Sequence, residues 1–150
     1  MDLILWRHAE AHDGVPDASR ALTEKGHTQA RLMAEWLQAH LPTQPRVLLS
    51  PARRAQETAQ ALSFESETSN AVGLAAMPFT LLSAAGWPDA QGAVIVVGHQ
   101  PTLGQVAAYL ICGEAADWSV KKGAIWWLSN RVRQNESQTV LRCVLGPDHL

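Results

Sequence analysis

Three short apolar runs constrain the fold of this chain more than any other feature of its sequence. They occupy residues 3–6, 47–49 and 93–97, and each has the length and composition of a buried β-strand. Segments with helical signals lie between and after them. Because strands that alternate with helices are typical of layered α/β domains, we predict a three-layer sandwich with a mostly parallel central sheet flanked by helices.

The remaining secondary structure is predicted from spacing and from helix-ending residues. Apolar side chains recur at helical intervals from Ala30 to Leu41, with Thr23 as the expected N-cap and Pro42 as the stop. Further helices are predicted over residues 53–62, 78–85 and 101–111, and a loop with a short strand over residues 63–76. Residues 124–128 and 140–145 are expected to form an antiparallel strand pair across a polar loop at 130–137.

Length and composition exclude several classes of protein. A chain of 150 residues suits one domain, which we expect to span residues 1–150. Its net charge of −2 argues against nucleic acid or acidic membranes as partners. We find no signal peptide and no stretch that could span a bilayer, so a cytoplasmic protein is expected. Cys112 and Cys143 lie in apolar contexts and are predicted to be buried thiols rather than a disulfide.

Basic or potentially basic residues follow each of the three apolar runs. Arg7 and His8 follow the first run, Arg54 lies just after the second, and His99 follows the third. Ligand crevices of open α/β sheets lie at the carboxyl ends of the strands, so these side chains are expected to converge. Guanidinium groups grip phosphate oxygens, and a neutral imidazole can attack phosphorus. The pattern therefore predicts a site for a phosphoryl group.

Four motifs in order make the chain resemble the histidine phosphatase superfamily, which includes the phosphoglycerate-mutase-like enzymes. They are Arg-His-Ala-Glu-Ala at 7–11, Arg-Ala-Leu-Thr-Glu-Lys-Gly at 20–26, Ser-Pro-Ala-Arg-Arg-Ala-Gln-Glu-Thr at 50–58 and Gly-His-Gln-Pro at 98–101. The resemblance is greatest to the small phosphohistidine phosphatases of the SixA type. It covers residues 3 to about 104, and the last third of the chain carries no such motif.

This resemblance implies a role for each residue of the predicted site. His8 would be the nucleophile that forms a phosphohistidine intermediate, which water then hydrolyses to inorganic phosphate. Arg7 and Arg54 would clamp the phosphoryl oxygens, and His99 would complete the ring around them. Arg20 would either reach the phosphate or tie the loop after His8 to the first helix.

Arg53 and His12 lie close in the sequence to the predicted site residues Arg54 and His8. Arg53 lies about 100° around a helix from Arg54, so only one of the two is expected to face the phosphate, and the motif register favours Arg54. His8 and His12 are four residues apart, but they follow a strand and precede Gly14 and Pro16. A helical zinc site is therefore not expected, and the predicted mechanism uses no metal and no cofactor.

The substrate class is predicted from the lack of a proton-donating glutamate in the motifs. Larger relatives carry a proton-donating glutamate where this chain reads Gly-Leu-Ala-Ala-Met at 73–77, and Glu65, Glu67 and Asp89 do not align with it. An alcohol leaving group suffers from this lack more than phosphohistidine, which departs as neutral imidazole. We therefore predict a phosphohistidine-bearing signalling protein as substrate. A phosphatase for small phosphate esters or anhydrides, and a phosphate-binding module without turnover, are the alternatives.

Overall fold

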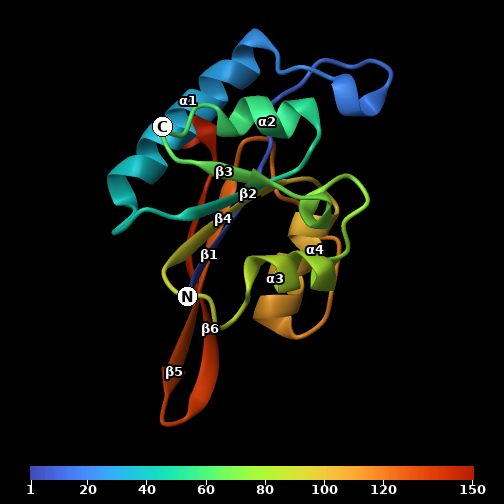
Figure 1. Ribbon diagram of the computed structural model, residues 1–150. Coiled ribbons are helices and arrows are strands. Elements are labelled where there is room, and N and C mark those ends of the chain that lie inside the picture. Colours follow the sequence, from blue (N-terminus) through green and yellow to red (C-terminus); the bar gives the residue numbers. More distant parts are fainter.

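A six-stranded sheet forms the centre of the computed structural model, which describes residues 1–150 (Figure 1). Its strand order is β3-β2-β4-β1-β5-β6. The first four strands in this order are parallel, whereas β5 and β6 are antiparallel to their neighbours. This confirms the predicted mostly parallel sheet with an antiparallel C-terminal pair. The strands are β1 (Asp2–Arg7), β2 (Arg46–Leu49), β3 (Ser66–Thr68), β4 (Ala93–Gly98), β5 (Ile125–Arg133) and β6 (Glu136–Leu145).

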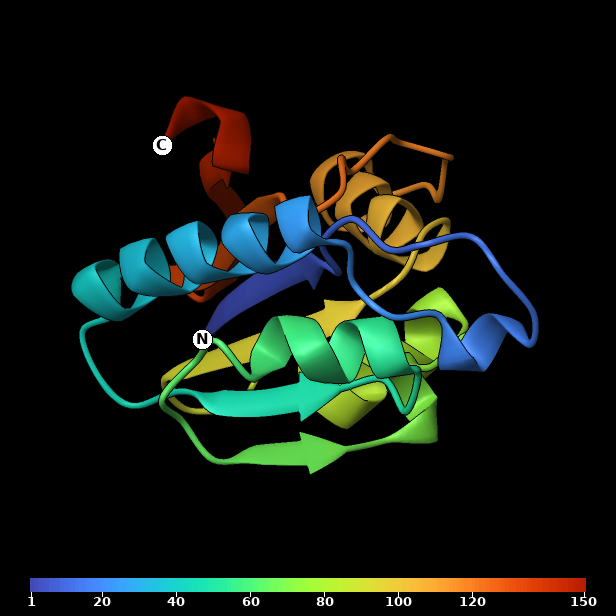
Figure 2. The same ribbon diagram turned by 90° about the horizontal axis from the view of Figure 1, so that it is seen from above.

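Two pairs of helices cover the two faces of the sheet, as Figures 1 and 2 show. Helices α1 (Glu24–His40) and α2 (Arg53–Ala59) cover one face, and α3 (Pro78–Ala85) and α4 (Thr102–Cys112) cover the other. Alternate side chains of β1 serve the two layers: Leu3 and Leu5 pack toward α3 and α4, and Ile4 and Trp6 pack toward α1 and α2. The predicted three-layer α/β sandwich is therefore confirmed.

The helix boundaries follow from their capping groups. The Thr23 side chain accepts a hydrogen bond from the Gly26 amide, as predicted for the N-cap of α1. Helix α3 has the predicted bounds, and α4 is capped after Cys112 by Gly113, which has a left-handed conformation with φ +82°. Helix α2 is shorter than predicted, because after Ala59 the chain tightens into a turn in which the amide of residue 62 bonds to the carbonyl of residue 59.

The predicted polar loop at 130–137 is wrong, because these residues extend β5 and β6 into a long hairpin that projects from the molecule in Figure 1. Only Gln134 and Asn135 form the turn, with φ angles of 52° and 64°. Residues 131–139 are exposed. Neither face of this part of the hairpin is buried against a core, so it lacks the apolar alternation from which a strand is recognised.

Both cysteines are free thiols, and the expectation that they are buried is wrong for Cys112. Cys112 is the last residue of α4 and is exposed, because the buried face of that helix consists of earlier residues such as Leu103 and Val106. Cys143 lies in β6 and is half-buried. No disulfide therefore contributes to the stability of the fold.

Among the helices, none is long and apolar enough to cross a membrane.

Candidate active site

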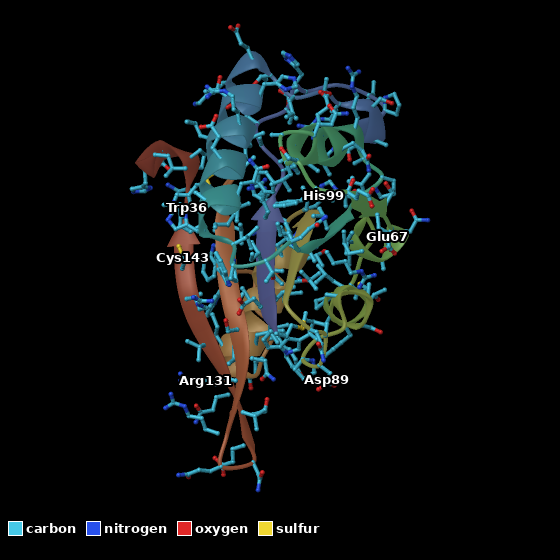
Figure 3. The ribbon with its side chains drawn as sticks, turned by 60° about the vertical axis from the view of Figure 1, so that its left-hand side comes forward. Trp36, Glu67, Asp89, His99, Arg131 and Cys143 are labelled. Atoms are coloured by element: carbon cyan, nitrogen blue, oxygen red, sulfur yellow. The ribbon has the colours of Figure 1, made fainter.

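The carboxyl ends of β1, β2 and β4 bring three separate parts of the sequence together at one edge of the sheet. Arg7 pairs with Gly98 in the register of β1 and β4, and Leu49 pairs with Val97 in that of β2 and β4. The His8 amide then bonds to the Gly98 carbonyl at 3.1 Å. Residues 8, 50 and 99 are consequently neighbours although they are far apart in the sequence, and Figure 3 shows His99 at this edge.

His8 is held in one tautomer by its two hydrogen bonds. Its Nδ1 lies 2.8 Å from the Ala9 carbonyl oxygen, and its Nε2 lies 3.2 Å from Nε of Arg54. A carbonyl oxygen only accepts and a guanidinium nitrogen only donates, so Nδ1 carries the hydrogen and Nε2 carries the lone pair. The ring is 6% exposed. The nitrogen that carries the lone pair is therefore turned toward Arg54.

Burial is also what keeps the His8 ring uncharged. It lowers the pKa of His8 to about 3, against the smaller opposing effect of the hydrogen bond to Ala9. The nearby His99, Arg54 and Arg7 lower this pKa further. At neutral pH the imidazole is accordingly neutral, which is the state that a nucleophile requires.

Arg54 reaches His8 from the first turn of α2, whereas Arg53 does not. Arg54 is 5% exposed, and its terminal nitrogens donate to the backbone carbonyl and the carboxylate of Asp17 at 2.8 and 3.1 Å. The exposed Arg53 instead pairs with Glu57 at 2.9 Å. Thr58 fixes the position of the helix, because its hydroxyl accepts from the Ala9 amide at 3.0 Å and donates to the Arg54 carbonyl at 2.7 Å.

Arg7 and His99 each leave one buried nitrogen without a hydrogen-bond partner, namely Nε of Arg7 and Nδ1 of His99. A terminal nitrogen of Arg7 donates to the Val120 carbonyl at 2.9 Å. Nε2 of His99 lies 2.7 Å from the hydroxyl of Ser50. Buried polar atoms without partners are uncommon and costly. Nε of Arg7, and Nδ1 of His99 when it carries a hydrogen, can each donate to an anion bound at this edge of the sheet.

The same factors perturb the pKa values of both side chains. Burial, assisted by Arg54, lowers the pKa of His99 to about 4 and holds the pKa of Arg7 below its usual value. The ring of His99 is therefore neutral at pH 7 in the free protein. A bound dianion would favour its protonated form.

A cavity of about 350 Å³ lies over these groups and contains all five residues of the predicted site. Four cationic side chains line it, those of Arg7, Arg20, Arg54 and Lys122, against the single carboxylate of Asp17. The remaining lining residues are His8, Ala11, Leu74, His99 and Gln100. This excess of positive charge, gathered where two imidazole rings lie 5.2 Å apart, suits an oxyanion.

The polar contacts of Arg20 lie within the loop after His8, whereas its predicted structural role is to tie this loop to the first helix. Nε of Arg20 donates to the His12 carbonyl at 2.6 Å, and a terminal nitrogen donates to Asp17 at 3.1 Å. Arg20 also lines the cavity, so the second role, contact with the phosphate, stays a prediction.

Asp17 and Lys122 line the cavity although their sequence context did not identify them. The hydrogen bonds from Arg20 and then Arg54 hold the pKa of Asp17 below its usual value, so its carboxylate is ionised. The spacing of three residues between Asp17 and Arg20 is the only feature of the local sequence that could have indicated their ion pair. Lys122 lies in a turn that is remote in sequence from the other site residues, so only the fold reveals its position.

The carboxylates of the 60–90 interval lie away from the cavity. Glu67 pairs with Arg46 at 3.1 Å, and none of Glu65, Glu67 and Asp89 lines the cavity. No group of three or more histidine, cysteine, aspartate or glutamate side chains is arranged to hold a metal ion. The segment from His8 to His12 is not helical, so these two rings do not share a helix face.

Comparisons with known proteins agree with this geometry. Residues 3–74 match the model of the histidine phosphatase superfamily (branch 1). The phosphohistidine phosphatase SixA of Escherichia coli (strain K12) is 32% identical over 127 residues, which cover 76% of this chain and 76% of that protein. The fold is similar to a solved protein histidine phosphatase SixA complexed with tungstate, with a TM-score of 0.74 and 24% identity over 99% of both chains.

A phosphatase of another substrate class shares the fold as well. The phosphoserine phosphatase of Entamoeba histolytica, solved with phosphoserine, has a TM-score of 0.72 and 16% identity, over 99% of this chain and 98% of that one. The fold alone therefore leaves the substrate class open.

Proposed function

Because the chain belongs to the histidine phosphatase superfamily, we propose that it is a metal-independent phosphatase that removes the phosphoryl group from phosphohistidine in a protein. The observation that carries this proposal is the neutral, buried ring of His8, whose Nε2 lone pair lies in a cationic cavity. A protein that only binds phosphate has no need of such a nucleophile.

The proposed reaction proceeds in two displacements at phosphorus. Nε2 of His8 attacks the phosphorus atom, the bond to the substrate histidine breaks, and the phosphoryl group becomes attached to His8. Arg7 and Arg54 hold the phosphoryl oxygens as negative charge spreads over them. The Ala9 carbonyl stabilises the positive charge that develops on the His8 ring through the bond to Nδ1. Water then attacks phosphorus, which releases inorganic phosphate and restores the neutral ring.

The lack of a proton donor supports phosphohistidine over an alcohol ester. Asp17 is the only carboxylate in the cavity, and its ion pairs with Arg20 and Arg54 keep it ionised. An ionised carboxylate cannot protonate a departing alkoxide, whereas a substrate imidazole protonated on its other nitrogen leaves without help.

Exposed apolar side chains in the segment that borders the cavity, and just after it in the sequence, support a protein as the substrate. Leu74 lines the cavity, and Met77 and Phe79 follow it with 64% and 65% of their surface exposed. Phe79 packs edge-on against Tyr109 with ring centroids 5.1 Å apart. Apolar patches beside a polar site are typical of surfaces that contact another protein.

The test is phosphate release from a phosphotransfer domain phosphorylated on histidine and from a panel of alkyl and sugar phosphates, all with EDTA present. We expect release from the phosphoprotein and slow turnover of the esters. His8→Ala and Arg54→Ala are each expected to lower release from the phosphoprotein by about 10³-fold or more. Arg53→Ala, which removes the neighbouring exposed arginine, serves as the matched control and should retain activity.

Three results would contradict parts of this proposal. Fast turnover of alkyl esters would favour the alternative, a phosphatase for small phosphate esters or anhydrides. Loss of activity in EDTA would contradict metal independence. Release that is equal in the wild type and in His8→Ala would show that His8 is not the nucleophile.

A further inference from the structure

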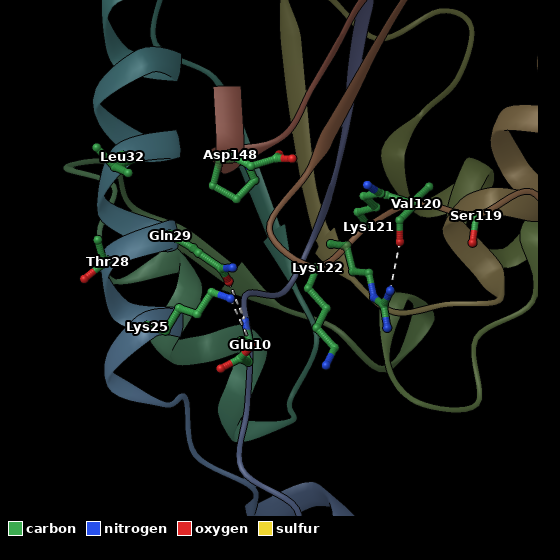
Figure 4. A pocket seen from close by; sticks show the side chains of 12 residues that line it. Glu10, Lys25, Thr28, Gln29, Leu32, Ser119, Val120, Lys121, Lys122 and Asp148 are labelled. Atoms are coloured by element: carbon green, nitrogen blue, oxygen red, sulfur yellow. Dashed lines mark hydrogen bonds and ion pairs between the residues drawn. The ribbon is translucent and has the colours of Figure 1, made fainter. Parts of the chain in front are cut away.

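A second cavity, of about 590 Å³, adjoins the phosphoryl cavity and has no part in the proposed displacements. The two cavities share Arg7 and Lys122 as lining residues. Figure 4 shows the walls of the second cavity: α1 with Lys25 on one side, the segment 119–122 on the other, and Asp148 near the C-terminus. A substrate that places its phosphoryl group near His8 therefore has space for a neighbouring group beside Arg7.

The second cavity carries an excess of positive charge. The basic side chains of Arg7, Lys25, Lys121 and Lys122 line it against the carboxylates of Glu10 and Asp148, and Glu10 pairs with Lys25 at 3.9 Å. Lys121 and Lys122 line the cavity, and neither forms an ion pair anywhere in the protein. Two ammonium groups are therefore free to bind an anion.

The fold fixes these lysines relative to the nucleophile. The Gly123 amide donates to the His8 carbonyl at 3.0 Å, and the Trp6 indole donates to the Gly123 carbonyl at 3.0 Å. Val120 is fully buried, and its carbonyl accepts the bond from Arg7. Residues on both sides of the lysine pair are thus attached to β1, whose end carries His8. Such attachment is what a binding group needs in order to act at a defined distance from a reacting atom.

We propose that the second cavity binds the carboxylate of an aspartate or glutamate that flanks the phosphohistidine of the substrate protein. This inference rests on the proposed function and deepens it by naming a recognition element of the substrate. The ammonium group of Lys121 contacts the carboxylate and Lys25 adds positive charge from the opposite wall, while Lys122 and Arg7, which line both cavities, lie between the carboxylate and the phosphoryl group. Since Glu10 and Asp148 offset part of the positive charge, a singly charged carboxylate fits better than a second phosphate dianion.

The test compares two phosphohistidine peptides that differ only in flanking glutamate against glutamine. For the wild type we expect kcat/KM to be about 3–10-fold higher for the glutamate peptide, as two partly exposed charge pairs would give, and to lose this preference at high salt. In Lys25→Ala/Lys121→Ala the ratio should approach one. Lys25→Glu/Lys121→Glu should instead prefer a peptide with flanking lysine, which a purely structural role cannot explain.

A matched control removes two positive charges far from the site. Arg131 and Arg133 lie on the exposed outer part of the hairpin, and Figure 3 shows Arg131 far from His99. The variant Arg131→Ala/Arg133→Ala should therefore keep the wild-type ratio. Equal kcat/KM for both peptides in the wild type would overturn the inference. So would a preference that persists in Lys25→Ala/Lys121→Ala.

A binding measurement separates this inference from the proposed function. Calorimetry with peptides that carry a hydrolysis-stable phosphonate analogue of phosphohistidine reports affinity without turnover. A glutamate preference in Kd, lost in Lys25→Ala/Lys121→Ala, would support the cavity's role even if no phosphohistidine were hydrolysed, in which case the proposed function alone would be wrong. Equal Kd values for both peptides would overturn the inference.

Discussion

At the scale of single residues, His8 and His99 are two bases that the fold keeps uncharged inside a cationic cavity. Their pKa values of about 3 and about 4 lie below the value of about 6.5 that each has in an unfolded chain. Between these limits the unfolded state binds protons that the folded state does not. Stability is therefore fully present above pH 6.5 and falls as the pH drops toward 4.

This linkage predicts a large effect of acid on the free energy of unfolding. At pH 5 each histidine should cost about 2 kcal/mol relative to pH 7. Replacing both rings in His8→Asn/His99→Gln should reduce the loss of stability between pH 7 and pH 5 by about 4 kcal/mol, measured by urea unfolding at the two values. His149→Gln, which removes an exposed histidine, should leave the loss unchanged. An equal loss in the wild type and the double variant would mean that the buried rings protonate normally.

Asp17 is a second single residue whose charge is expected to affect anion binding. Its carboxylate occupies terminal nitrogens of both Arg20 and Arg54 and adds negative charge to an anion site. Asp17→Asn should therefore tighten the binding of inorganic phosphate by about 3–10-fold, measured by calorimetry at low salt. Asp13→Asn is the matched control, because Asp13 lies on the same loop but is fully exposed and 3.9 Å from Arg20. Weaker binding in Asp17→Asn would show that the carboxylate instead positions Arg54.

At the scale of elements, the β5–β6 hairpin carries a turn whose residues do not suit its conformation. Both Gln134 and Asn135 have positive φ, which costs free energy for side chains other than glycine and, to a lesser degree, asparagine. Gln134→Asn/Asn135→Gly should raise the free energy of unfolding by about 0.5–1 kcal/mol. Because β5 pairs with β1, the gain should appear in the global urea transition.

The control for this turn places the same residue types in the neighbouring strand. Gln138→Asn/Thr139→Gly should lower stability, since glycine and asparagine are unfavourable in extended backbone. If both double variants were destabilised alike, the positive φ angles would not be what limits the stability of the hairpin.

Elements with a strong local signal could be predicted from the sequence, and those defined by distant contacts could not. Helix α3 has its predicted bounds because proline and glycine mark its ends, and Thr23 caps α1 as its side chain requires. The outer hairpin has no buried face and hence no apolar pattern.

The same distinction between local sequence signals and contacts of distant residues applies to the site. Its five predicted residues lie in motifs, and the structure brings them together, although their chemical roles stay predictions. The position of Lys122 arises only when the segment before β5 folds beside β1, so no local pattern could reveal it.

At the scale of the whole molecule, the site exists only when the sheet and α2 are assembled. His8, Arg54 and His99 come from three elements, and Thr58 bonds α2 to the segment that follows β1. An oxyanion in the cavity should consequently bind the folded protein and not the unfolded chain, so binding should stabilise the entire fold.

We therefore expect inorganic phosphate at 100 times its Kd to stabilise the protein by about 2.7 kcal/mol. For a chain of this size this corresponds to a rise in Tm of about 5–10 °C. Arg54→Ala removes a guanidinium that lines the cavity and should abolish most of the shift at the same phosphate concentration. Arg53→Ala, one residue away on the exposed side of α2, should retain it. Because both variants lose one positive charge, equal shifts would mean that phosphate binds by general charge attraction, whereas a difference would locate it beside His8.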